Sequence, residues 1–201
     1  MSFCTAENLV GCDMKVEKTA LAGVLELTPN RYGDQRGFFS ETYNKAVWEG
    51  IGIDIEFVQD NHSKSQKAGT LRGLHFQAPP KAQDKLVRVV AGAILDVAVD
   101  IRIGSPTFGK WTKVELSADN GKQLFVPKGF LHGFLTLTEA TEVVYKCSDF
   151  YAPDCDGAVR FDDPAIGIDW GWDCGNLLLS DKDANAASFE TFESPFHYEE
   201  T

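Results

Sequence analysis

The feature that most constrains the fold is a series of short apolar or alternating runs, which begins near residue 23 and continues through most of the chain. These runs are rich in Val, Ile, Phe, Thr and Tyr, the residues that pack well on a pleated sheet, and Gly, Pro, Asn and Asp separate them. Such spacing predicts many β-strands joined by tight turns, as in an all-β sandwich, jelly roll or small barrel. The runs are GVLEL, FFSETY, IEFVQD, TLRGLHF, KLVRVV, AILDVAVD, KWTKVEL, QLFVP, HGFLTL and EVVYKCSDF.

Helical signals are few. Short helices are predicted near Asn44 to Glu49 and near Asp181 to Ala187, because each segment begins with a capping-type residue and lacks strand alternation. Neither a repeat nor a linker divides the 201 residues, so residues 1–201 are expected to form one domain. We expect its core to span about 15–188, while 189–201 form either a tail or a segment that docks on a neighbour.

The balance of charge argues against two classes of partner. Thirty acidic and nineteen basic residues give a net charge of −11, the wrong sign for a protein that binds nucleic acid or an anionic membrane. Asp96, Asp100 and Arg102 interrupt the most apolar stretch, and the N-terminus does not resemble a signal peptide. The five cysteines include no CxxC pair, which favours a reducing, cytoplasmic location over a disulfide framework or a structural zinc site.

Basic residues gather in one segment of this acidic chain. Residues 61–95 contain six Lys and Arg and a single acidic residue, which predicts a local site for a small polyanion such as a phosphate ester. In a regular strand Arg72 would face away from His75, unless a glycine or a bulge interrupts the alternation. Three of the six lie among apolar residues in predicted strands: Arg72, Lys85 and Arg88. The other three are interpreted as solvated lysines: Lys64, Lys67 and Lys81.

Two histidines occupy positions that suggest chemistry. His75 lies in a predicted strand, and His132 follows the turn of PKGFLH, which together resemble the two motifs of the cupin jelly roll. Metal-binding cupins need an HxH pair and a nearby carboxylate, because a divalent cation requires three or four converging ligands. Here the pair reads His75-Phe76-Gln77, and no carboxylate follows before Asp84. We therefore predict no metal, and a histidine that acts as a base.

Eight strings of residues, in order along nearly the whole chain, resemble the dTDP-4-dehydrorhamnose 3,5-epimerase family. They are DQRGFFSE, QDNHS, LRGLHFQ, KLVRVVAG, DVAVDIRIGSPTFGKW, PKGFLHGF, VVYKCSDFYAP and LSDKDA. The resemblance implies a cupin-type jelly-roll barrel with a few short helices. It also implies an isomerase without a cofactor, which converts dTDP-4-dehydro-6-deoxy-D-glucose to dTDP-4-dehydro-L-rhamnose by inverting C3 and C5 through an enolate.

The resemblance also implies catalytic roles. A base on one face of the sugar, an acid on the other and a cation beside the C4 oxygen are what such a reaction needs. By motif, His75 is the base and Tyr145 is the acid. Asp183 orients His75, with Asp181 as a rival for this role, and Lys85 stabilises the enolate.

Further residues are implied for substrate binding. The guanidinium groups of Arg36 and Arg72 suit the diphosphate. In the family the DxRGFF segment reaches the neighbouring subunit's site, which implies a homodimer with shared active sites. The other binding residues implied are Phe39 and Glu41 on that segment, Gln59 and Asn61 for the nucleoside, Tyr151 for stacking on the base, and His132 in the pocket wall.

Three other functions remain open on the residues alone. An enzyme that epimerises only C3 or only C5 of a nucleotide-linked 4-keto-6-deoxysugar would share every motif. A metal-dependent cupin isomerase or dioxygenase would need His75 and His132 to hold a metal. A non-catalytic sugar-binding jelly roll would retain the arginines but would have no need for the catalytic residues.

Overall fold

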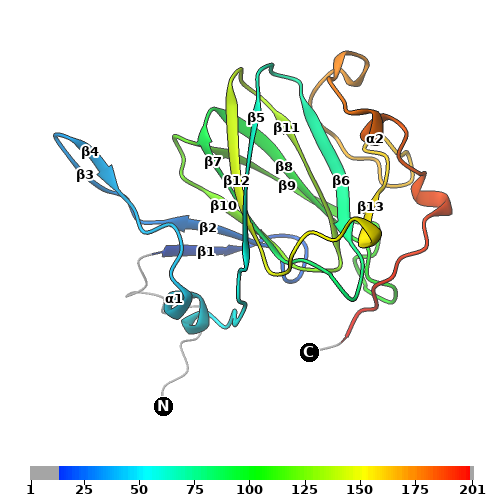
Figure 1. Cartoon of the computed structure of the whole chain (residues 1–201), viewed down its shortest axis with the longest axis horizontal. Helices are drawn as coiled ribbons and strands as arrows, with labels where there is room; N and C mark the ends of the chain where they lie inside the picture. The colour runs from blue at the N-terminus through cyan, green and yellow to red at the C-terminus, as the bar shows by residue number, and fades with distance from the viewer. Residues whose placement is uncertain (1–13, 200–201) are drawn as a thin grey trace.

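Two antiparallel sheets face each other and enclose the core, as the computed structural model of residues 14–199 shows (Figure 1). The all-β prediction is confirmed. The first sheet runs in the order β1 (Met14–Lys18), β2 (Leu25–Pro29), β10 (Gln123–Val126), β7 (Lys85–Ala91), β12 (Thr141–Cys147) and β5 (Gln59–Ser65). The second runs in the order β13 (Asp156–Ala158), β6 (Leu71–Gln77), β11 (Phe130–Thr136), β8 (Ala93–Asp100) and β9 (Trp111–Ser117).

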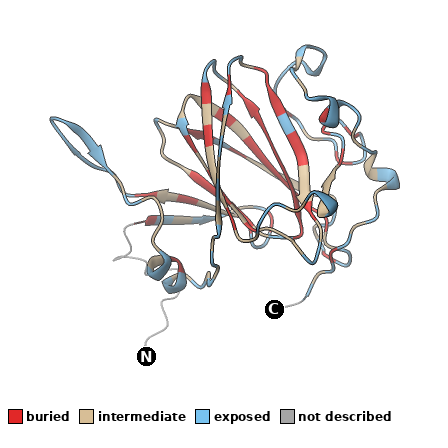
Figure 2. Cartoon of the chain, in the orientation of Figure 1, coloured by how far each residue is buried: buried red, intermediate tan, exposed pale blue. Residues whose placement is uncertain are grey.

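Apolar side chains from both sheets fill the space between them. Strands β7 and β12 contribute Val87, Val89 and Val143, which belong to the same buried cluster as Ile94 of β8 and Phe130 of β11. Figure 2 shows the colour of buried residues along most of β8 and β11, whereas in β7 and β12 it is interspersed with the intermediate colour. Because a strand turns successive side chains to opposite faces, the inward positions also determine which polar groups reach the interior.

The outer face of each sheet is covered by a different part of the chain. Residues 159–199 cover the second sheet, where Val159, Trp170 and Phe196 are buried against Val97 and Leu131. The C-terminal residues up to 199 therefore dock on their own barrel. Residues 1–13 and 200–201 lie outside the described part of the chain, and so does the prediction made for the N-terminus. The first sheet is covered by α1 (Lys45–Gly50) and its flanking residues, around the buried Trp48.

A hairpin of β3 (Tyr32–Asp34) and β4 (Gly37–Phe39) projects away from the barrel (Figure 1). The sequence predicted a strand at FFSETY, but only its beginning is a strand, and β1, β3 and β13 were missed. These are short or largely polar, so alternation of apolar residues does not reveal them.

The predicted helices are present, as α1 and as α2 (Asp181–Ala184), with Asn44 and Ser180 as their N-caps. Short 3₁₀ turns occur at Pro153–Cys155, Cys174–Asn176 and Phe189–Thr191. No helix within residues 14–199 is long and apolar enough to cross a membrane.

Candidate active site

A cavity of about 510 Å³ opens between the two sheets, and each sheet contributes polar side chains to its wall. His75 of β6 and His132 of β11 lie opposite each other in the register of the second sheet. Lys85 of β7 and Tyr145 of β12 come from the first sheet. Two histidines therefore face a lysine and a tyrosine across the cavity, although the four residues are far apart in the sequence.

The imidazole of His75 is paired with the carboxylate of Asp183. His75 Nε2 lies 2.5 Å from Asp183 Oδ1, and the side chains are 30% and 3% exposed. Asp183 lies in the first turn of α2, where the N-cap Ser180 accepts from its amide at 3.1 Å and donates to its Oδ2 at 2.9 Å. Asp181, the rival in the sequence, is exposed and does not line the cavity.

The environment of Asp183 favours its charged form. Burial raises the pKa of this carboxyl, but hydrogen bonds from His75, Ser180 and the Gly73 backbone outweigh burial, and the pKa is lowered overall. The ionised carboxylate can only accept, so His75 Nε2 carries a proton. In the neutral imidazole the other ring nitrogen, Nδ1, then holds the lone pair that a general base needs.

Arg72 and His75 line the same cavity, so the alternation expected of a regular strand does not hold between them, and the exception that a glycine or a bulge allows applies here. The pairing of β6 with β11 shifts register between these residues: His75 and Arg72 are three residues apart in β6, but their partners in β11 are only two apart. Gly73 occupies the shift, with a φ of +129° and a cis peptide bond to Leu74. A Cβ at Gly73 would lie 2.5 Å from the Cα of Gly133, so the close approach of the strands requires glycine here.

Burial adjusts both groups on the first sheet. The pKa of Lys85 is lowered by burial, against which Cys147, Asp156 and Asp96 act to raise it. The pKa of Tyr145 is raised, chiefly by burial, which keeps the phenol protonated. Among residues 14–199 neither the ammonium nor the phenol has a hydrogen bond to another side chain, so both can interact with a bound molecule.

The sequence reasoning missed Asp96. His132 Nε2 lies 2.7 Å from Asp96 Oδ1, and both side chains are buried. The other oxygen, Oδ2, is buried without a hydrogen-bond partner in the described part of the chain. The available signal was Asp96 in the middle of the apolar run AILDVAVD, a position that does more than interrupt a possible membrane span.

A second cavity of about 390 Å³ adjoins the first and shares His75, Lys85 and Tyr145 with it. Gln59, Asn61 and Tyr151, predicted to bind the nucleoside, line this second cavity. Its wall also contains residues that were not predicted as site residues: Phe76, Gln77, Gln83, Asp156 and Lys182.

The residue that replaces the second histidine of an HxH pair has a structural role. Gln77 donates to the Phe150 carbonyl at 3.0 Å and accepts from the Ala152 amide at 2.9 Å. It therefore holds the loop that carries Tyr151. The Tyr151 hydroxyl donates to Asp156 at 3.3 Å, and Asp156 is also hydrogen-bonded by Lys182.

The projecting hairpin carries the remaining predicted binding residues away from both cavities of its own chain. Arg36 is 84% exposed at its side chain and forms an ion pair with Asp34. Phe39 is 69% exposed, and Glu41 accepts from Asn44 at 2.9 Å. None of the three predicted residues lines a cavity with His75.

The remaining basic residues of the segment 61–95 lie elsewhere. Arg88 is next to Leu86 on the outer face of the first sheet, so it does not join Arg72 and Lys85. Lys64 and Lys81 form ion pairs with Glu142 and Asp149 at 2.9 and 3.1 Å.

Comparison with known proteins gives matches over most of the chain. The family model described as dTDP-4-dehydrorhamnose 3,5-epimerase matches residues 18–191. A Shigella flexneri protein of that name is 52% identical over 177 residues, which are 88% of this chain and 96% of the relative. A Legionella pneumophila dTDP-6-deoxy-D-glucose-3,5-epimerase, solved in complex with dTDP-4-keto-L-rhamnose, superimposes with a TM-score of 0.89 at 43% identity. The match covers 93% of this chain and all of that one.

A related activity occurs on the same fold. A 3'-monoepimerase from Streptomyces bikiniensis, in complex with dTDP-quinovose, has a TM-score of 0.79 at 36% identity, covering 86% of this chain and 87% of that one. The two double epimerases named above are more similar in sequence, and the Legionella pneumophila structure superimposes more closely.

Proposed function

This chain belongs to the dTDP-4-dehydrorhamnose 3,5-epimerase family, and we propose that its cavity inverts C3 and C5 of dTDP-4-dehydro-6-deoxy-D-glucose to give dTDP-4-dehydro-L-rhamnose. One observation carries the assignment of residues: His75 on one sheet, paired with Asp183 of α2, faces Tyr145 and Lys85 on the other sheet. Inversion at carbon requires that a proton leave one face and that another arrive at the opposite face. Two facing sheets supply a base and an acid in that relation.

The reaction begins with proton abstraction. The C4 ketone acidifies the C–H bonds at C3 and C5, and His75 takes one of these protons while the electron pair of that bond moves onto the C4 oxygen. The enolate that forms is stabilised by the ammonium of Lys85. The carboxylate of Asp183 holds the imidazole in the reactive tautomer and stabilises the imidazolium that results.

Reprotonation completes each inversion. Tyr145 gives its phenolic proton to the opposite face of the carbon, the carbonyl re-forms, and the site holds a phenolate and an imidazolium. Exchange with water returns a proton to Tyr145 and removes one from His75, after which the second carbon reacts in the same way. The neighbouring His132–Asp96 pair places a second imidazole in the wall of the same cavity.

Binding of the nucleotide is proposed to involve two subunits. Arg72 at the mouth of the first cavity, with Gln59, Asn61 and Tyr151 in the second, provides contacts for the diphosphate and the nucleoside. Arg36, Phe39 and Glu41 would enter the partner's site in a homodimer, which fits their exposure on a projecting hairpin.

This arrangement predicts complementation between inactive chains. Arg36→Ala and His75→Ala homodimers should both be nearly inactive, whereas a mixed dimer would contain one intact site. If chains exchange freely, half of the dimers in an equimolar mixture are mixed, and the mixture should recover up to about a quarter of the wild-type activity. Mixtures that remain as inactive as the parent proteins would argue that Arg36 acts within its own chain.

Cofactor chemistry is not part of the proposal. His75 and His132 are each hydrogen-bonded to a separate carboxylate instead of converging on a common point. Turnover should therefore be unchanged by prolonged dialysis against EDTA, and activity lost to the chelator and restored by a divalent metal would contradict this. We also place the protein in the cytoplasm, where Cys147, Cys155 and Cys174, which are free in the structure, would remain reduced.

The experiment that tests the function separates double from single inversion. The purified protein is incubated with dTDP-4-dehydro-6-deoxy-D-glucose, the ketone is reduced with borohydride, and the released sugars are identified by NMR. The proposal predicts L-rhamnose configuration at both C3 and C5. Inversion at one carbon only would identify a mono-epimerase, the alternative that also occurs on this fold.

A further inference from the structure

The C-terminal strap, which we define as residues 192–199, lies beyond the residues that match the family model. It crosses the outer face of the second sheet, behind the strand that carries His75, and the proposed reaction does not use it. Phe196 of the strap is 8% exposed, and Phe192 is half-buried against the same apolar cluster. The strap is therefore a packed part of the barrel.

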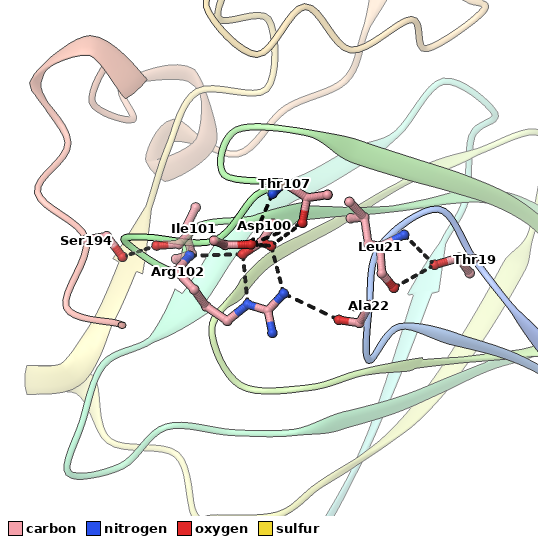
Figure 3. Close-up of polar contacts among 9 residues, drawn as sticks. Thr19, Leu21, Ala22, Asp100, Ile101, Arg102, Thr107 and Ser194 are labelled. Carbon is pink, nitrogen blue, oxygen red and sulfur yellow. Dashed lines mark hydrogen bonds and ion pairs between the residues drawn. The ribbon is translucent and has the colours of Figure 1, made fainter. Parts of the chain in front are cut away.

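Main-chain and side-chain bonds fix the strap to the end of β8. Ile103 donates to the Phe196 carbonyl at 2.9 Å, and Tyr198 donates to the Ile103 carbonyl at 3.0 Å. The Ser194 hydroxyl donates to the Ile101 carbonyl, as Figure 3 shows. These bonds hold the strap on both sides of Phe196.

A buried ion pair forms the anchor at this end of the barrel (Figure 3). The Arg102 guanidinium donates to both oxygens of Asp100, at 2.9 and 2.7 Å, and Asp100 is fully buried. The same guanidinium lies 4.4 Å from the centre of the Phe130 ring and 5.0 Å from that of Tyr198. A cation held in this way can fix an aromatic ring of the strap against the barrel.

The strap packs directly against the neighbour of the base. The ring of Phe76 meets the rings of Phe192 and Phe196 edge to face, with centroids 5.3 and 6.2 Å away. On the adjacent strand β13, a Cβ added to Gly157 would overlap the Phe76 ring, so Phe76 also lies tightly over that glycine. Phe76 and His75 are consecutive in β6, so a displacement of one moves the other.

The other member of the catalytic pair is continuous with the strap. Asp183 belongs to α2, and the chain then returns to the barrel where Arg160 donates to the Ala187 carbonyl at 2.9 Å. From there the ring of Phe189 stacks on that of Phe192, with centroids 6.0 Å apart. One segment therefore carries Asp183 at its start and supports the strand of His75 at its end.

We propose that the C-terminal strap is a positioning element for the His75–Asp183 pair: Phe192 and Phe196, through Phe76, hold β6 where the imidazole meets the carboxylate. The strap touches neither base nor carboxylate, so its residues are positioning residues. The inference rests on the proposed function, because it concerns the rate of that proton transfer.

The first test compares Phe196→Ala with two other variants. Small displacements of a catalytic group cost on the order of 10- to 100-fold in rate, so Phe196→Ala should lower kcat by that factor while KM changes less than about twofold. Phe196→Leu should recover most of kcat, because it restores an apolar side chain to the site. Leu27→Ala, in the separate cluster on the other sheet, is the matched control and should lower Tm while kcat is retained. Phe192→Ala, at a half-buried position, provides a milder strap variant if Phe196→Ala does not fold.

A second readout does not need turnover. The proton between His75 Nε2 and Asp183 Oδ1, which are 2.5 Å apart, should give a far-downfield NMR resonance in the substrate-free protein. This resonance should shift or broaden in the strap variants and remain in Leu27→Ala. An unchanged resonance and kcat in folded strap variants would overturn the inference. If the wild-type protein is inactive on the dTDP-sugar but the resonance still changes in the strap variants, the proposed function is wrong and the positioning role stands.

Discussion

His75 and Asp183 are 108 residues apart in the sequence, yet their side chains meet at 2.5 Å in the wall of the cavity. β6 places the imidazole, and the first turn of α2 places the carboxylate, which Ser180 orients from the N-cap position. The pair forms only when β6 and α2 are both packed in their native positions. The catalytic power of the histidine therefore depends on the tertiary structure around it.

Asp183→Asn should lower kcat by about 100-fold or more, because the amide keeps the shape but cannot stabilise the imidazolium. KM should change little, since the side chain of Asp183 is only 3% exposed and does not need to contact the nucleotide. Steady-state kinetics on the dTDP-sugar measure both constants. Asp181→Asn, in the same helical turn but exposed, is the control. Equal losses in the two variants would contradict the assignment of Asp183.

Tyr145→Phe should separate proton removal from inversion. Without the phenol, the base can still remove a proton from the sugar and return it to the same face, so exchange with solvent continues while the inverted product is lost. The comparison of deuterium uptake with product yield measures this. The prediction fails if the variant forms inverted product at the wild-type rate.

Lys85→Met should reduce kcat by roughly 100- to 1000-fold, the usual effect of removing a group that stabilises an enolate-like charge. Burial lowers the pKa of Lys85 and raises that of Tyr145. Because burial lowers the pKa of Lys85, loss of the ammonium proton as the pH rises predicts an alkaline fall in wild-type kcat. That fall should be absent or moved to higher pH in Lys85→Met, and an unchanged profile would exclude Lys85 as its source.

The fold was predictable to the extent that alternation of apolar residues marks strands. The run AILDVAVD coincides with β8. Its apolar side chains are buried on both faces of the strand, because Ile94 packs between the sheets and Val97 packs on the outer face. β3 and β13 escaped the same reasoning, since they are short, exposed or half-exposed, and carry no alternation of apolar residues.

The site was predictable in its residues more than in its geometry. The resemblance to the family pointed to His75, Lys85, Tyr145 and Asp183, which the structure brings to one cavity. Regular alternation would turn Arg72 away from His75; the letters LRGLHFQ show that Gly73 could interrupt the alternation, but not that the register shifts there. Asp96 was missed for a related reason: its pairing with His132 depends on which strands are neighbours.

The anchor beside the strap should make stability depend on pH. Burial raises the pKa of Asp100, but hydrogen bonds from Arg102, Ser105 and Thr107 outweigh burial and lower it overall. A carboxyl whose pKa is lower in the folded than in the unfolded chain contributes stability above the unfolded value, near 3.9, and this is lost as the pH falls through the folded value. The contribution of Asp100 is therefore complete at neutral pH.

Asp100→Asn should accordingly lower the free energy of unfolding at pH 7 by about 3–5 kcal/mol, the usual cost of breaking a buried ion pair. The difference from wild type should shrink as the pH approaches 3, and urea unfolding at the two pH values measures it. Asp119→Asn, at an exposed position, is the control and should have little effect. A difference that is the same at both pH values would contradict the account of Asp100.

The most direct test of the central claim, that His75 removes the protons at both carbons, is deuterium exchange in heavy water. The wild-type protein and His75→Ala are each incubated with dTDP-4-dehydro-6-deoxy-D-glucose, and the C3 and C5 proton signals are followed by NMR. We expect loss of both signals with the wild-type protein, and exchange slower by a factor on the order of 100 to 10,000 with His75→Ala. Exchange at both carbons at the wild-type rate in His75→Ala would contradict it.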